Sequence, residues 1–307
     1  MIYTVTFNPA LDYTITIPDF QLGRVNRTTE ELVLAGGKGI NVSTVLHNLG
    51  MDSTVLGFIA GFTGHEIQRR IREMQIPEQL IDLPDGMSRI NIKLHSAEET
   101  DLNGMGPVIS DSDLQLFYRQ LDVLQSGDVL VLAGSIPSSL PVTVYQDILQ
   151  QLESRDILTV VDATGHLLQN VLPYHPFLIK PNHHELGDLF GVSIQSRQEI
   201  LPYAKKLQAQ GARNVLVSMA GEGAALLTEN GDYYEQDAPA GTVVNAVGAG
   251  DSMVAGFLYG YLTRQDYAHA FQLGIACGSA SAFSSKLAVA DEIWGVYDEQ
   301  HCKTYPE

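Results

Sequence analysis

Short apolar segments that alternate with helical segments are the feature that most constrains the fold of this chain. The apolar runs occupy residues 128–132, 158–161, 177–179 and 214–217, and helical periodicity is found at residues 142–153 and 198–210. Strands that are apolar on both faces are typical of parallel sheets covered by helices on each side. The sequence therefore predicts an α/β fold with a mostly parallel central sheet.

Polar residues follow these strands directly. They are Ser135, Asp162, Lys180, Asn182 and Ser218. In open parallel sheets, ligands bind outside the carboxyl ends of the strands, so we expect the functional site at this edge. Residues 13–17 and 89–94 alternate between apolar and polar instead, which favours a small second sheet that projects over the site as a lid.

The charge of the chain excludes several classes of function. Its 307 residues carry a formal net charge of −18, which argues against binding to nucleic acid or to an anionic membrane. No apolar run has the length of a membrane span, and the N-terminus has no basic region of a signal peptide. Cys277 and Cys302 form no metal or redox spacing, so we expect a cytoplasmic protein.

Residues 245–257, NAVGAGDSMVAGF, carry the strongest functional pattern. The turn Gly248, Ala249 and Gly250 leads into an acid, Asp251, and then into an apolar helix. A glycine turn at a helix start directs backbone N–H groups toward an anion. A carboxylate at the same place suits proton transfer, so the pattern indicates phosphoryl transfer with Asp251 as the base.

A second glycine turn precedes a lysine. Gly36 and Gly37 would allow a ligand to approach the backbone, Lys38 would supply a cation, and Asn41 follows on the next helical turn. The alternative is a tight turn with a solvated lysine. The segment is not a Walker A loop, and the dinucleotide fingerprint G-x-G-x-x-G fails in every candidate place.

Asn182 and Glu185 follow a strand with the spacing of either a magnesium site or a helix cap. A carboxylate near phosphates could organise Mg²⁺ and its waters, whereas Asn182 with Glu185 could form a capping box. Both interpretations can hold together. His183 and His184 are neighbours in the sequence, so we expect them to point apart and to form no zinc site.

Other polar residues and glycines allow two interpretations each. Asp12 could accept sugar hydroxyls or belong to a turn, and Arg89 could bind phosphate or be solvated. Gly221 and Gly223 could pass beside a nucleotide or form a hairpin.

Taken together, the motifs resemble the PfkB family of ribokinase-like sugar kinases. The resemblance covers nearly the whole chain and includes, in family order, NPALD, AGGKGINV, RIN, LNGMGP, AGSIP, KPNHHE, SMAGEG and VGAGDSMVAGF. It implies a single ribokinase-like domain over residues 1–307, a three-layer α/β/α fold, and a β lid near residues 10–34 and 88–108. The lids of such kinases often pair, which implies a possible homodimer.

The resemblance also implies roles for individual residues. Asp251 matches the catalytic base, and Gly248, Ala249 and Gly250 match the anion hole. Glu185 matches a residue that acts on Mg²⁺ through water. The nucleotide side comprises Lys180, Asn182, Ser218, Gly221 and Gly223. The sugar-phosphate side comprises Asp12, Gly36, Gly37, Lys38, Asn41, Arg89 and Ser135, with Arg27 and Asn103 as weaker matches.

The implied reaction is ATP-dependent phosphorylation of a sugar phosphate. Three motifs are most similar to family members that phosphorylate D-fructose 1-phosphate at O6 to give fructose 1,6-bisphosphate. Tagatose 6-phosphate and fructose 6-phosphate are the alternative substrates. A sugar-phosphate-binding regulator without catalysis is a remote alternative, which the intact Asp251 and glycine turn disfavour.

Overall fold

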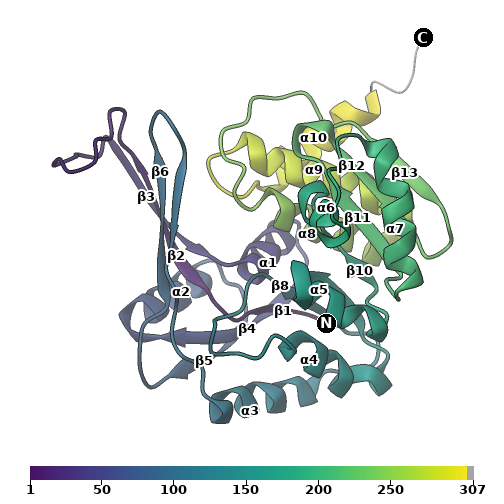
Figure 1. The fold of residues 1–307 in the computed structure, drawn as a ribbon, viewed down its shortest axis with the longest axis horizontal. Coiled ribbons are helices and arrows are strands. Elements are labelled where there is room, and N and C mark those ends of the chain that lie inside the picture. Colours follow the sequence, from purple (N-terminus) through teal and green to yellow (C-terminus); the bar gives the residue numbers. More distant parts are fainter. Residues whose placement is uncertain (303–307) are drawn as a thin grey trace.

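The computed structural model describes residues 1–302, with only the backbone described for residues 301 and 302. The last five residues of the domain predicted over 1–307, and the side chain of Cys302, lie outside the described residues. The chain forms one nine-stranded sheet and one four-stranded sheet, with helices on both faces of the larger sheet (Figure 1).

The nine-stranded sheet has the order β13-β12-β11-β10-β9-β8-β1-β4-β5. Its pairs are parallel from β11 to β5 and antiparallel on either side of β12. The strands are β1 (Ile2–Thr6), β4 (Ser53–Ala60), β5 (Glu78–Leu83), β8 (Val129–Ala133), β9 (Leu158–Asp162), β10 (Leu178–Ile179), β11 (Asn214–Ser218), β12 (Ala224–Leu227) and β13 (Tyr233–Gln236).

Helices pack on each face of this sheet and produce three layers. One apolar core unites the sheet with α3 (Asp111–Gln120), α4 (Val144–Leu152), α5 (Gly165–Val171), α6 (His183–Phe190) and α7 (Ile200–Ala209). The other face is covered by α1 (Lys38–Asn48), α8 (Ala249–Arg264), α9 (Tyr267–Phe283) and α10 (Ala290–Cys302). A smaller cluster adds α2 (Gly61–Glu73) and joins it to the base of the four-stranded sheet.

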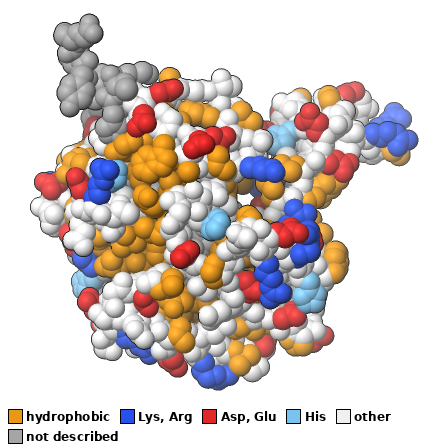
Figure 2. Space-filling view, turned by 180° about the vertical axis from the view of Figure 1, so that it is seen from behind, with side chains coloured by type: hydrophobic (Ala, Val, Ile, Leu, Met, Phe, Trp, Pro, Cys, Tyr) orange, Lys and Arg blue, Asp and Glu red, His pale blue; other side chains and the backbone are white. Residues whose placement is uncertain are grey.

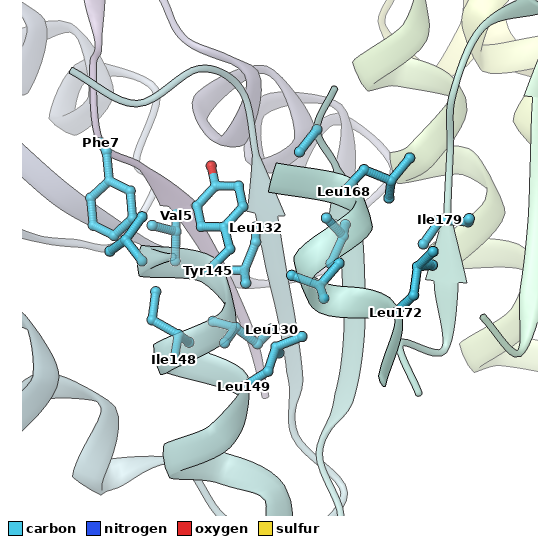
Figure 3. Packing of buried hydrophobic residues seen from close by; sticks show 14 of the residues in the cluster. Val5, Phe7, Leu130, Leu132, Tyr145, Ile148, Leu149, Leu168, Leu172 and Ile179 are labelled. Carbon is cyan, nitrogen blue, oxygen red and sulfur yellow. The ribbon is translucent and has the colours of Figure 1, made fainter. Parts of the chain in front are cut away.

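Large aromatic side chains fill the core between the sheet and helices α3 to α7. Phe7 stacks on Phe58 and Tyr145 and meets the edge of Phe117, and these rings are all buried. Figure 3 shows Tyr145 beside Leu132 and Phe7, at the end of β8 from which the functional residues extend. The dense packing fixes the position of the strand ends.

The four-stranded sheet projects from this body as a lid. Its order is β3-β2-β6-β7, with β2 and β6 parallel and the other pairs antiparallel. The strands are β2 (Ala10–Thr16), β3 (Glu30–Gly36), β6 (Arg89–His95) and β7 (Thr100–Asn103). Figure 1 shows the β2–β3 hairpin extending away from the body, with its connecting loop at the far end. Among the described residues, no helix is long and apolar enough to span a membrane.

Candidate active site

The first turn of α8 holds Asp251 at the carboxyl edge of the large sheet. The helix begins after Gly248, whose φ of 81° lies in the left-handed region that favours glycine. A Cβ added to Gly250 would lie 3.2 Å from Nζ of Lys180, so the lysine lies against the turn. Asp251 is 4% exposed, and its Oδ2 accepts a hydrogen bond of 2.8 Å from Nδ2 of Asn41.

The surroundings of Asp251 make its carboxyl group a better proton acceptor. Burial is the largest effect, and the nearby Asp162 carboxylate adds to it, so the pKa of Asp251 is raised to about 7. The charges of Lys38 and Lys180 and the hydrogen bond from Asn41 act in the opposite direction. A general base is most effective when its pKa lies near the working pH, so a carboxyl group with a pKa of about 7 is suited to proton transfer near neutral pH.

Asp162 joins two lysines beside this helix start. Its Oδ1 lies 3.1 Å from Nζ of Lys38 and its Oδ2 lies 3.5 Å from Nζ of Lys180. Burial alone would raise the pKa of Asp162, but the two ammonium groups outweigh burial and lower it. Burial alone would lower the pKa of Lys38, but the carboxylates of Asp162, Asp251 and Glu185 raise it. The pKa shifts of Asp162 and Lys38 therefore both favour the charged ion pair.

The base of the lid carries a second polar group. Nδ2 of Asn91 donates to Oδ1 of Asp12 at 2.8 Å, and Nε of Arg89 donates to the backbone oxygen of Asn8 at 3.0 Å. A Cβ on Gly36 would lie only 2.0 Å from Oδ2 of Asp12, so a larger residue there would displace the Asp12 carboxylate. Burial lowers the pKa of Arg89, and the charge of Asp12 opposes that effect.

A cleft of about 570 Å³ lies between the lid and the body, and Asp12 and Asn41 both line it. Residues 243–247, residues 286 and 287, and parts of α1 and α2 also line it. Figure 2 shows the lid standing out from the body beside this hollow. Asn41 lines the cleft and also donates to Asp251, so it connects the cleft wall with this carboxyl group.

Asn182 and Glu185 form the capping box of α6. Oδ1 of Asn182 accepts from the backbone N–H of Glu185 at 2.9 Å, and Oε2 of Glu185 accepts from that of Asn182 at 2.8 Å. The rings of His183 and His184 lie 3.8 Å apart, so the expectation that they point apart was wrong. Even so, no group of three or more acidic, histidine or cysteine side chains among the described residues could hold a metal ion by itself.

Several of the remaining predicted residues lie at strand ends or in the turn after β11. Ser135 follows β8 and Ser218 ends β11, where it bridges to Asn182 at the sheet edge. Gly221 and Gly223 lie in the turn between β11 and β12, and Gly223 has a φ of 89° and packs against the backbone of Gln236. These strand ends and turns share the edge that carries the site.

The two weaker sequence matches, Arg27 and Asn103, both lie in the lid. Arg27 is exposed in the loop between β2 and β3, at the end of the hairpin far from the body (Figure 1). Asn103 is exposed at the end of β7, opposite Asn91 in the neighbouring strand. The structure therefore does not bring Arg27 to the site of its own chain.

Sequence reasoning gave no role to three residues that the structure places at the site. Asp162 stood out only as a polar residue at a strand end, although it contacts both lysines. Asn91 orients Asp12, and the backbone of Asn8 orients Arg89. Asn91 ends the RIN motif, two residues after Arg89 in an alternating strand, and this position is a signal that could have identified it.

Comparison with known proteins defines the family. The model of the pfkB family of carbohydrate kinases matches residues 5–292. The 1-phosphofructokinase of Bacillus subtilis is 47% identical over 95% of each chain, and the D-tagatose-1-phosphate kinase of Bacillus licheniformis is 34% identical over 94% of each. The structure of a putative phosphofructokinase from Staphylococcus aureus is 41% identical, with a TM-score of 0.85 over 97% of each chain. This chain belongs to the PfkB family of carbohydrate kinases, and the predicted ribokinase-like fold is confirmed.

We predict that Asn182→Ala lowers the free energy of unfolding by about 1 kcal/mol, because an N-cap side chain is lost. Asn182→Ser should retain most of the stability, since a serine hydroxyl can accept the same N–H. Urea unfolding of the three proteins measures the difference. An alanine variant as stable as the unchanged protein would show that the capping box does not stabilise α6.

Proposed function

We propose that this kinase transfers the γ-phosphoryl group of ATP to O6 of D-fructose 1-phosphate and so forms fructose 1,6-bisphosphate. The observation that carries the proposal is the buried Asp251 in the first turn of α8, with a raised pKa and two lysines beside it. The similarity to the Bacillus subtilis 1-phosphofructokinase supports the choice of sugar.

In the proposed reaction, the Asp251 carboxylate accepts the O6 proton while O6 attacks the γ-phosphorus atom. The bond between this phosphorus and the bridging oxygen breaks, and the electron pair leaves with ADP. The backbone N–H groups after Gly248 and the ammonium group of Lys180 face the transferring group, where negative charge is stabilised without rearrangement. The cleft beside Asn41 holds the sugar so that O6 reaches the base.

The sugar is oriented from the lid side in this proposal. Asp12 and Asn41 bind hydroxyl groups, and Arg89 binds the phosphate on C1. The sequence suggested that Lys38 shares this last role. However, Lys38 contacts Asp162 and its charge acts on Asp251. Because C1 and O6 lie at opposite ends of the sugar, we now propose that Lys38 acts near the transferred phosphoryl group.

Magnesium would be bound mainly through ATP. Mg²⁺ usually keeps several waters and takes few carboxylates together with substrate phosphates. Glu185 fits this use. Its carboxylate is close enough to raise the pKa of Lys38, and only its Oε2 is engaged in the capping box. The bound ion would neutralise phosphate charge, and Glu185 would hold its waters.

Asp251→Asn should lower kcat by about 10² to 10⁴, the range for loss of a general base. In the unchanged enzyme, kcat/KM should rise with pH through about 7 and then level off, because only ionised Asp251 accepts the proton. Steady-state assays across pH measure both effects.

A suitable control is Asp85→Asn, which makes the same charge change at an exposed position and should leave turnover unchanged. Turnover of Asp251→Asn close to that of the unchanged enzyme would remove Asp251 from the role of base. Calorimetry with the sugar phosphate should show that binding survives the substitution.

The choice of sugar is tested by kcat/KM for four substrates: fructose 1-phosphate, fructose 6-phosphate, tagatose 1-phosphate and tagatose 6-phosphate. We expect fructose 1-phosphate to exceed each of the others by at least about tenfold, since hydroxyl and phosphate positions are read by partly buried polar groups. Preference for tagatose 1-phosphate would instead align the chain with its Bacillus licheniformis relative.

We also propose that two copies of the chain pair through their lids. The lid loop exposes Phe20, Leu22 and Val25, and β7 exposes Leu102. Apolar side chains gathered on a projecting sheet favour a protein partner, and the edges of β3 and β7 are unpaired within the four-stranded sheet.

Sedimentation should therefore give a dimer at micromolar concentration, and the double substitution Leu22→Asp with Val25→Asp should shift it toward monomer. Val123→Asp places the same charge at an exposed apolar residue outside the lid and should leave the dimer intact. A monomer without any substitution would reject the pairing.

A further inference from the structure

Asp162 is a buried carboxylate to which the reaction above assigns no step. It ends β9 and is 1% exposed. Its backbone is fixed, because β9 pairs with β8 up to Ala133 and the N–H of Gly134 donates to the oxygen of Asp162 at 3.0 Å. A charge at such a position is costly unless it is paired, so its presence calls for a reason beyond packing.

The side chain of Asp162 connects groups from two different parts of the site. Lys38 begins α1, and its Nζ contacts Oδ1. Lys180 follows β10, is 4% exposed, and its Nζ lies 3.5 Å from Oδ2 and against Gly250. The Oδ2 contact is an ion pair without hydrogen-bond geometry, and that oxygen has no hydrogen-bond partner. One carboxylate thus holds two ammonium groups at the start of α8.

Two ammonium groups placed together repel each other, and long lysine side chains lose conformational freedom when they are held. The central carboxylate offsets both effects before any substrate is bound. When a phosphoryl group with its negative oxygens arrives, the lysines are already oriented toward it. Such preorganisation stabilises the transition state more than the bound substrate.

We propose that Asp162 is a positioning residue that holds Lys38 and Lys180 together beside Asp251 for the transferring phosphoryl group. This inference rests on the proposed kinase reaction but does not depend on which sugar phosphate is the acceptor. Asp162 itself touches no reacting atom and acts through the two lysines.

The cluster also connects Asp162 with the base. The charged groups that act on Asp251 are Asp162 from β9, Lys38 from α1 and Lys180 after β10, and Asn41 donates to it. Glu185 from α6 acts on Lys38 in turn. Loss of the Asp162 charge should therefore lower the pKa of Asp251, and loss of the Lys38 charge should raise it.

The first test is Asp162→Asn, which keeps the shape and removes the charge. We expect kcat to fall by about 10- to 100-fold, as for other residues that orient functional groups, with smaller changes in KM. The acid limb of kcat/KM should move to lower pH. Tyr145→Phe is a matched control, because it removes a buried hydroxyl that donates to the oxygen of Gly134, at the end of the neighbouring strand β8, without changing a charge.

Lys38→Met is the second variant. Because the Lys38 side chain is partly exposed, this substitution should disturb folding less than Asp162→Asn does. Its acid limb should move to higher pH, opposite to that of Asp162→Asn. In the double variant, the loss of kcat should be smaller than the product of the two single losses, because the residues act as one unit.

Titration of the Asp251 carboxyl group by NMR of ¹³C-labelled aspartate, without substrates, gives a readout that is independent of turnover. We expect its midpoint to move down in Asp162→Asn, up in Lys38→Met and not at all in Tyr145→Phe. Unchanged midpoints in both charge variants, or multiplicative losses of kcat, would overturn the positioning role. Failure of fructose 1-phosphate as a substrate would overturn only the proposed sugar, since the NMR result needs none.

Discussion

The parallel pairing of β8, β9 and β10 is the constraint on which the site depends. Ala133 pairs with Asp162 in one pair, and Val161 pairs with Ile179 in the next, so Asp162 and Lys180 leave the sheet side by side. Because parallel strands all end at the same edge, residues far apart in the sequence reach one place without any irregular backbone. The cores on both faces hold this edge in position.

The helix that carries Asp251 packs closely against its neighbour α9. Added Cβ atoms at Gly256 and Gly260 would lie 2.5 Å from Sγ of Cys277 and 2.7 Å from Cα of Ala270, so α8 and α9 approach at glycine positions. Asp251, in the first turn of this closely packed helix, is 4% exposed. The raised pKa of Asp251 is thus a consequence of helix packing as much as of neighbouring charges.

A chain with a net charge of −18 must still receive highly charged anions. Local cations and donors are available to bind these anions: two lysines at the helix start, Arg89 at the base of the lid, and the backbone N–H groups after Gly248. At short range in a buried site, a few fixed cations outweigh a distant net charge that salt screens.

The sequence by itself determined the α/β class, the edge of the sheet that carries the site and the start of α8. These follow from local patterns, namely apolar runs, glycine turns and capping residues such as Asn182 with Glu185. Only the tertiary structure decided that Asp162 joins Lys38 to Lys180, that Asn91 orients Asp12, and that Arg27 lies away from the body. Each of these contacts or positions depends on strand register or on the direction of a hairpin. The sequence does not reveal them, because contacts between distant segments are set by packing of the whole chain and leave no periodic pattern in the sequence.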